Sequence, residues 1–232
     1  MMKVLIAVST LLATGVFSDA DLIKARDRQD KAALEKIVTD LKAAADRDAK
    51  DAAAQYRFAL AESYTAEVAI ETHDKNAAKN AAQAGIDAAE RAVALKADSS
   101  EYQRILGTLC GQMISGQGLA GLKYGKCALT AVNKAVELDP KSSINYLSHG
   151  VGNYYLPQAL GGGIELAIKD FRKAIELNPK NADAYLWLGV ALRKNNQPEE
   201  AHKAIARSLE LNPNRVWAKQ QLDKTPEKQP AP

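Results

Sequence analysis

The stretch Ala167-Ile168-Lys169-Asp170-Phe171-Arg172-Lys173-Ala174-Ile175-Glu176-Leu177-Asn178-Pro179 decides the fold, because its pattern occurs three times in the chain. An earlier copy ends Lys134-Ala135-Val136-Glu137-Leu138-Asp139-Pro140, and a later one ends Ser208-Leu209-Glu210-Leu211-Asn212-Pro213. Each copy has apolar residues at helical spacing and then a proline, which cannot continue a helix. The last two prolines are 34 residues apart, and a period of this length predicts a stack of helical repeats.

A second helical stretch precedes each copy, so the sequence predicts helix pairs. We expect pairs over residues 51–97, 98–140, 141–179 and 180–213, followed by a capping helix over 214–223. Residues 21–50 are predicted to form an N-terminal capping helix, since Leu34, Ile37, Val38 and Leu41 fall on one helical face. Residues 224–232, rich in Pro and Lys, are predicted to form a disordered tail. The predicted fold is an all-α, right-handed α-solenoid in one domain.

The last pair carries a family resemblance. Ala184-Tyr185-Leu186-Trp187-Leu188-Gly189-Val190-Ala191-Leu192, then Ala201 and the final copy of the pattern, resembles the tetratricopeptide repeat (TPR). The resemblance implies small residues where the two helices of a pair cross, because close approach requires little bulk there. It also implies a non-enzymatic scaffold that binds proteins through the concave side of the solenoid. The expected small residues are Gly107, Ala128, Gly150, Ala167, Gly189 and Ala201.

The spacing between the two small positions of a pair is uneven, falling from 24 residues in the first pair to 12 in the last. The extra residues lie in the turns within pairs. Glu90-Arg91-Ala92-Val93, Tyr154-Tyr155-Leu156-Pro157 and Leu160-Gly161-Gly162-Gly163 resemble an exported branch of repeat proteins that includes the TPR component associated with TRAP-type transporters and, more distantly, the regulators of microtubule dynamics. Those relatives carry an acidic residue where Gly163 stands. The resemblance implies an exported helper that binds a small apolar ligand or a partner protein.

The N-terminal residues 1–20 predict a signal peptide. Lys3 precedes an apolar run from Val4 to Phe17, and Ser18-Asp19-Ala20 offers small residues for cleavage after Ala20. The alternative is an uncleaved anchor, but the run is shorter than the roughly 18 apolar residues that a membrane helix needs. We therefore expect a periplasmic or secreted protein without a membrane span after cleavage, and an unidentified protein partner in the cell envelope.

The composition excludes several classes of function. The 232 residues have a net charge of only +3, with acidic and basic residues interspersed, so no nucleic-acid-binding surface is expected. No arrangement of Ser, His, Cys or carboxylates points to catalysis, a metal or a cofactor. The sequence favours a binding protein that is not an enzyme.

The family's register places a candidate binding groove on the first helices of the third and fourth pairs. Its middle would be apolar and aromatic and its C-terminal edge basic. Two alternatives stay open at this point: the groove accepts a protein segment or an apolar ligand, or it is covered by residues 21–48 or by the long first pair. The expected groove residues are Ile144, Leu147, Val151, Tyr154, Tyr155, Leu186, Val190, Arg193 and Lys194.

The two cysteines, Cys110 and Cys127, lie on the paired helices of one repeat. In an oxidising compartment they could form a disulfide at the base of the insert from Gly116 to Gly125. The alternative is that both are small buried residues.

Overall fold

The structure is a computed structural model that describes residues 17–114, 120–225 and 227. In these ranges it contains eleven α-helices, one short 3-10 helix and no strand, so the predicted all-α solenoid is confirmed. The α-helices are α1 (Asp19–Asp27), α2 (Lys31–Arg47), α3 (Ala52–Glu71), α4 (Lys75–Leu95), α5 (Ser100–Ile114), α6 (Ala120–Leu138), α7 (Ser143–Tyr155), α8 (Ile164–Leu177), α9 (Ala182–Lys194), α10 (Pro198–Leu211) and α11 (Val216–Asp223).

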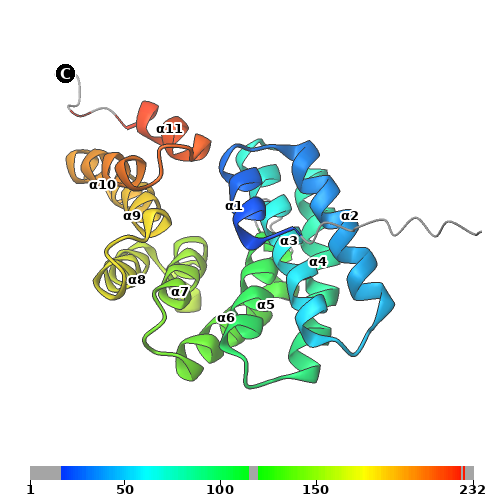
Figure 1. The fold of residues 1–232 in the computed structure, drawn as a ribbon. Coiled ribbons are helices and arrows are strands. Elements are labelled where there is room, and N and C mark those ends of the chain that lie inside the picture. The colour runs from blue at the N-terminus through cyan, green and yellow to red at the C-terminus, as the bar shows by residue number, and fades with distance from the viewer. Residues whose placement is uncertain (1–16, 115–119, 226, 228–232) are drawn as a thin grey trace, which may run out of the picture.

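The helices form two rows. Consecutive helices pack as pairs, α3 with α4, α5 with α6, α7 with α8, and α9 with α10. Helices α3, α5, α7 and α9 also contact one another in that order, so they make the inner row of the arc. Figure 1 shows the arc running from α2–α4 round to α9–α11, with α1 on the side of α3 that faces α9 and α11. Helix α1 therefore lies between the two ends of the arc.

Local sequence chemistry ends and begins the helices. Helices α8 and α10 end at Leu177 and Leu211, directly before the Asn-Pro dipeptides, as the repeated pattern predicts. The next helix then starts with a side-chain cap: Ser142 accepts from a backbone N–H of α7, and Asn181 does so for α9. Such caps satisfy N–H groups that have no partner within the helix. The turns between pairs are therefore short and defined.

The small positions bring paired helices together closely. A Cβ on Gly107 would lie 3.0 Å from the carbonyl oxygen of Ala128, and one on Gly189 would lie 2.8 Å from that of Ala201. At Gly150 the neighbour is different, since a Cβ there would meet the ring of Phe171 at 2.6 Å. Ala167 is fully buried beside that ring. These residues are therefore packing positions.

The N-terminal capping segment differs from its prediction. Residues 21–50 contain parts of two helices, because Gln29 adopts a left-handed conformation with φ 53° and Asp30 starts α2 as its cap. A break of this kind redirects the chain, so α1 does not continue the line of α2. Leu34, Ile37 and Leu41 of α2 are buried as the helical pattern predicts.

The structure describes only part of the predicted signal peptide and of the predicted C-terminal tail. Of the expected signal peptide, residues 1–16 lie outside the described part, whereas Ser18 caps α1 through a capping box with Asp21. The expected cleavage point after Ala20 thus falls inside α1. At the other end, Thr225 corrects the expected disordered tail: it is 1% exposed, and its hydroxyl accepts a hydrogen bond from Arg193. Residues 226 and 228–232 lie outside the described part.

No helix in the described ranges combines the length and the apolar character that a membrane span requires.

Glu62 of α3 gives the first prediction. Its side chain lies against Gly85 of α4 and is 7% exposed, and burial raises its pKa to about 7. Because the folded pKa exceeds the unfolded one, ionisation of Glu62 opposes folding, and stability is lost as pH rises from about 4.5 to about 7. We expect Glu62→Gln to raise the free energy of unfolding by about 2 kcal/mol at pH 8 and much less near pH 5. Urea unfolding at both pH values measures this, and an equal effect at both would contradict the assignment.

Candidate binding site

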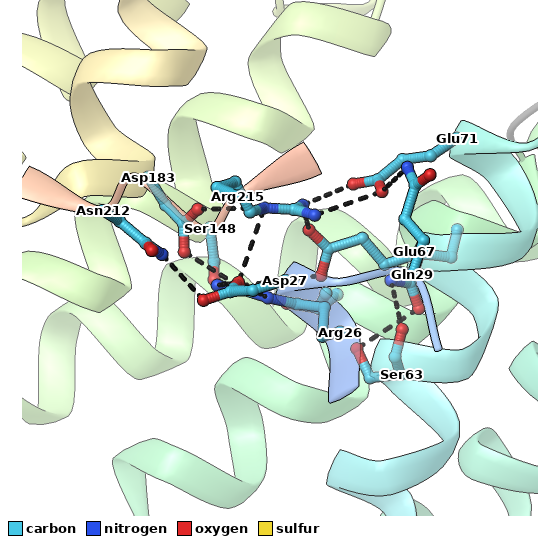
Figure 2. Close-up of polar contacts among 12 residues, drawn as sticks. Arg26, Asp27, Gln29, Ser63, Glu67, Glu71, Ser148, Asp183, Asn212 and Arg215 are labelled. Atoms are coloured by element: carbon cyan, nitrogen blue, oxygen red, sulfur yellow. Dashed lines mark hydrogen bonds and ion pairs between the residues drawn. The ribbon is translucent and has the colours of Figure 1, made fainter. Parts of the chain in front are cut away.

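The N-terminal helix α1 closes the arc against its far end. Arg26 lies in its last turn, and Nη1 of Arg26 donates a hydrogen bond of 2.8 Å to Oδ2 of Asp183, 157 residues later, in the first turn of α9. The guanidinium also lies 5.0 Å from the centre of the Tyr64 ring on α3. Figure 2 shows Arg26 and Asp183 together with Glu67 and Arg215, so that polar groups converge from α1, α9, α3 and the segment before α11. A helix from the start of the chain thus joins the inner surface of the solenoid at two places.

Arg215, the residue before α11, is the second cation of this cluster. It is 1% exposed, and Nη2 of Arg215 lies 2.6 Å from Oε1 of Glu67. A second ion pair joins it to Glu71, and its Nε lies 3.7 Å from carboxylate oxygens of both Asp27 and Asp183. The segment that carries the third copy of the repeated pattern therefore ends in a buried contact with α1 and α3 (Figure 2).

A neutral side chain completes the contact. Asn212, which ends α10 in the repeated pattern, donates from Nδ2 to Oδ2 of Asp27 at 2.7 Å. Nearby, Gln29 donates to Glu71 at 2.9 Å. We call Arg26, Asp27, Glu67, Glu71, Asp183, Asn212 and Arg215 the closure cluster.

The charges of the closure cluster do not balance. Two arginines face four carboxylates, and two of the carboxyl groups have shifted pKa values. Burial, reinforced by the charge of Glu67, raises the pKa of Glu71 to about 7 even though Arg215 opposes the change. Burial alone would also raise the pKa of Asp183, but Arg26 and Arg215 hold it below its ordinary value. Asp183 is therefore the carboxylate that stays ionised and accepts hydrogen bonds from the arginines. Glu71 is the carboxyl group that is protonated first as pH falls.

A cleft of about 500 Å³ opens beside the closure cluster, between α1 and the turns that start α7 and α9. Two apolar side chains project into it, Ile23 from α1 and Ile144 from α7, which are 40% and 43% exposed. The other lining side chains are mostly polar or charged, and they come from α1, α3, the starts of α7 and α9 and the turns after the repeated pattern. The lining residues are Ile23, Arg26, Tyr64, Ser142, Ser143, Ile144, Asn178, Lys180, Asn181, Ala182, Asp183 and Asn212.

The expected groove residues divide into separate environments. Ile144 lines the cleft, whereas Leu147 and Val151 are half-buried against the core of α8 and α9. Tyr154 and Tyr155 belong to an aromatic group with Trp187, and the centres of the Tyr154 and Trp187 rings are 5.6 Å apart. The ammonium of Lys194 lies 4.3 Å from the centre of the Tyr154 ring. The cleft and the aromatic group are two surfaces and not one continuous groove.

Three of the expected groove residues contact α11 and the segment after it, so their prediction as binding residues is wrong. Leu186 is fully buried and Val190 is 5% exposed, both in a core with Ala218 of α11. Arg193 donates to Gln221 and Thr225 at 2.7 Å. The reason is that α11 packs on this part of α9, as the next repeat of a longer array would.

The two alternatives for the concave side each hold for part of it. Helix α1 covers the inner surface next to α3 and the start of α9, through the contacts of Arg26 and Asp27. The aromatic group is less covered, since Tyr155 is 44% exposed. Self-coverage therefore comes from α1 near α3 and the start of α9, and from α11 over the rest of α9.

The cysteines are joined. Cys110 of α5, 1% exposed, forms a disulfide with Cys127 of α6, with their Cα atoms 6.0 Å apart. The bond links the two helices that flank residues 115–119, which lie outside the described part. Among the described residues, no group of His, Cys, Asp and Glu is arranged to hold a metal ion.

Comparison with known proteins adds two family matches. The model of the regulator of microtubule dynamics protein 1–3 family matches residues 16–159, more than half of the chain. A tetratricopeptide repeat model matches residues 171–203. No curated protein sequence matches the chain.

Solved structures resemble the fold. TTC0263, a thermophilic TPR protein of Thermus thermophilus, is 15% identical with a TM-score of 0.62, and the match covers 87% of this chain and 98% of that one. YrrB, described as a TPR protein with an unusual peptide-binding site, is 20% identical with a TM-score of 0.45 over 82% and 84% of the two chains. MamA of Desulfovibrio magneticus RS-1 is 17% identical with a TM-score of 0.47 over 87% and 99%. The match to TTC0263 shows that the helices are arranged as in a TPR protein.

Proposed function

The chain belongs to the regulator of microtubule dynamics protein 1–3 family, and we propose that it is a non-enzymatic scaffold that binds a protein partner in the cleft between α1 and the starts of α7 and α9. One observation carries the proposal: Ile23 and Ile144 are both about two-fifths exposed inside a cleft with a polar wall. Apolar side chains within a polar rim are the common anatomy of a protein interface. An extended segment with an apolar side chain fits this arrangement.

The cellular place of the partner is part of the same proposal. The apolar N-terminal run favours export, and we place the partner in the cell envelope. The family name describes its named members as regulators of microtubule dynamics, so microtubules are the alternative partner. Co-sedimentation with purified microtubules separates the two: protein that pellets with them would overturn the envelope partner. N-terminal sequencing of the native protein tests export, and a start at Met1 would refute cleavage.

A matched pair of substitutions tests the cleft. Ile144 in the cleft and Leu166 on α8 are equally exposed, at 43% and 44%, but only Ile144 lines the cleft. We expect Ile144→Asp to reduce partner capture from the native host at least about tenfold, since a buried interface core tolerates no unpaired charge, and Leu166→Asp to leave it unchanged. Quantitative mass spectrometry of the captured proteins measures both. Equal effects of the two substitutions would contradict the cleft as the site.

The second candidate function is a carrier of a small apolar ligand that assists a transporter. It is favoured by an apolar hollow of about 250 Å³ between α2 and α3, lined mainly by Leu34, Val38, Val68 and Ala69. Ligand pockets usually have roughly 300–1,000 Å³, so this hollow suits at most a short chain. Native mass spectrometry would reveal a retained lipid, and a ligand-free spectrum would leave the scaffold as the function.

A further inference from the structure

We infer that α1 is a tethered ligand of the inner surface of the solenoid, and that a partner which binds this surface presents a short helix with an adjacent Arg and Asp in place of Arg26 and Asp27. The inference rests on the proposed function only in taking the concave side as the binding side. It describes a different state of that side, because the cleft includes Ile23 of α1 and requires α1 to be docked, whereas this partner takes the place of α1. It adds what that side recognises and what occupies it when no partner is bound.

The surface beneath α1 is complementary to this pair of residues. Asp183 and Glu67 lie 2.8 and 4.0 Å from Nη1 of Arg26, so acceptors from α9 and α3 receive the guanidinium. Asn212 and Arg215 approach the carboxylate of Asp27 at 2.7 and 3.7 Å, so a donor and a cation receive the carboxylate. The surface therefore offers hydrogen-bond acceptors where the Arg of an Arg-Asp pair lies, and donors where the Asp lies.

The recognition requires arginine and not lysine. Nε and Nη2 of Arg26 bond to Asp27 at 2.9 and 2.6 Å, while Nη1 bonds to Asp183. The central carbon of the same guanidinium lies over the Tyr64 ring, 5.0 Å from its centre. A planar guanidinium makes all of these contacts at once, whereas an ammonium group is a compact point charge.

The attachment of α1 is polar and short, which makes its displacement feasible. Its buried apolar side chains are Leu22 and Ala25 alone, and its remaining buried residues are the charged Arg26 and Asp27. Ion pairs in a buried site return little net free energy, because both charges lose their hydration. A helix of nine residues is also unstable by itself. Helix α1 therefore remains docked chiefly because its tether keeps it at a high effective concentration.

The test uses the full chain and a labelled peptide with the sequence of residues 18–28. The docking of α1 is weakened in the double variant Arg26→Gln, Asp27→Asn, which loses the contacts with Asp183 and Asn212. We expect this variant to bind the peptide at least about tenfold more tightly than the wild-type protein, whose own α1 competes at roughly millimolar effective concentration. A control peptide in which residues 26 and 27 exchange places should bind the variant at least about tenfold more weakly, because donors and acceptors no longer match. Fluorescence anisotropy measures all of these affinities.

Three binding results would overturn the inference: equal affinity of both proteins for the peptide, equal affinity of the variant for both peptides, or no binding by a variant that keeps its helical circular dichroism. If the double variant fails to fold, native-state hydrogen exchange on the wild-type protein tests the inference instead. We expect the amides of α1 to exchange by local opening, with a lower free energy than those of α3. Exchange of α1 only through global unfolding would overturn the inference. The Ile144→Asp experiment fails or succeeds independently of these measurements.

Discussion

Arg215→Met is expected to lower the free energy of unfolding by about 3–5 kcal/mol, because it leaves buried carboxylates without their main cation. Arg215 is 1% exposed and pairs with Glu67 and Glu71, and its Nε is near Asp27 and Asp183. Methionine fills a similar volume, so the loss reports charge more than packing. Arg26 cannot compensate, since its guanidinium is already bonded to Asp183 and Asp27.

The effect of Arg215→Met depends on pH in a defined direction. The pKa of Glu71 is already raised to about 7 in the folded protein, and loss of Arg215 raises it further. A raised folded pKa means that stability falls as pH rises above the unfolded value of about 4.5. We therefore expect a larger loss near pH 8 than near pH 5 in urea unfolding followed by circular dichroism.

Arg207→Met is the matched control for Arg215→Met. Arg207 also pairs with a carboxylate, Glu210 at 2.6 Å, but its side chain is 49% exposed. An exposed pair contributes little to stability because water screens its charges, so the control should unfold almost like the wild type. A cost for Arg215→Met no larger than that of the control would show that the closure cluster does not hold the arc closed.

The repeated pattern predicts much of the fold because its information is local. The Asn-Pro ends of α8 and α10, and the close crossings at Gly107 and Gly189, follow from residue types at fixed spacing. Each repeat contacts mainly its neighbours, so a short window of sequence is sufficient to place it. The same logic explains the error at Leu186: the repeat pattern does not show that α11 covers the last pair.

The closure cluster could not be predicted, because its information is not local. Arg26 and Asp183 are 157 residues apart, and Arg215 is 144 residues from Glu71. In sequence these residues resemble ordinary charges on solvated helix faces, since burial of a charge leaves no periodic signal. The break at Gln29, which frees α1 from the direction of α2, rests on one left-handed residue that is not glycine. The best local signals were the adjacent Arg26 and Asp27, and Arg215 directly after an Asn-Pro turn.

Gly189→Ala is expected to lower the free energy of unfolding by about 3 kcal/mol, although alanine favours helices over glycine. The added Cβ would lie 2.4 Å from Cγ1 of Ile205 and 2.8 Å from the carbonyl oxygen of Ala201. The carbonyl belongs to the backbone of α10, so relief requires the two helices to separate. Thermal and urea unfolding measure the loss.

Gly152→Ala is the matched control, because it adds the same methyl group at a helical glycine where no second helix packs closely. Gly152 lies inside α7, and a Cβ there has nothing within 4 Å outside its own helix and immediate neighbours. Alanine should therefore stabilise the protein by about 0.5–1 kcal/mol through helix propensity alone. Opposite signs for one substitution at two helical glycines would separate packing from propensity. If Gly189→Ala also stabilised the protein, the close approach of α9 to α10 would not be what fixes the last repeat, and α11 would have to hold that pair together.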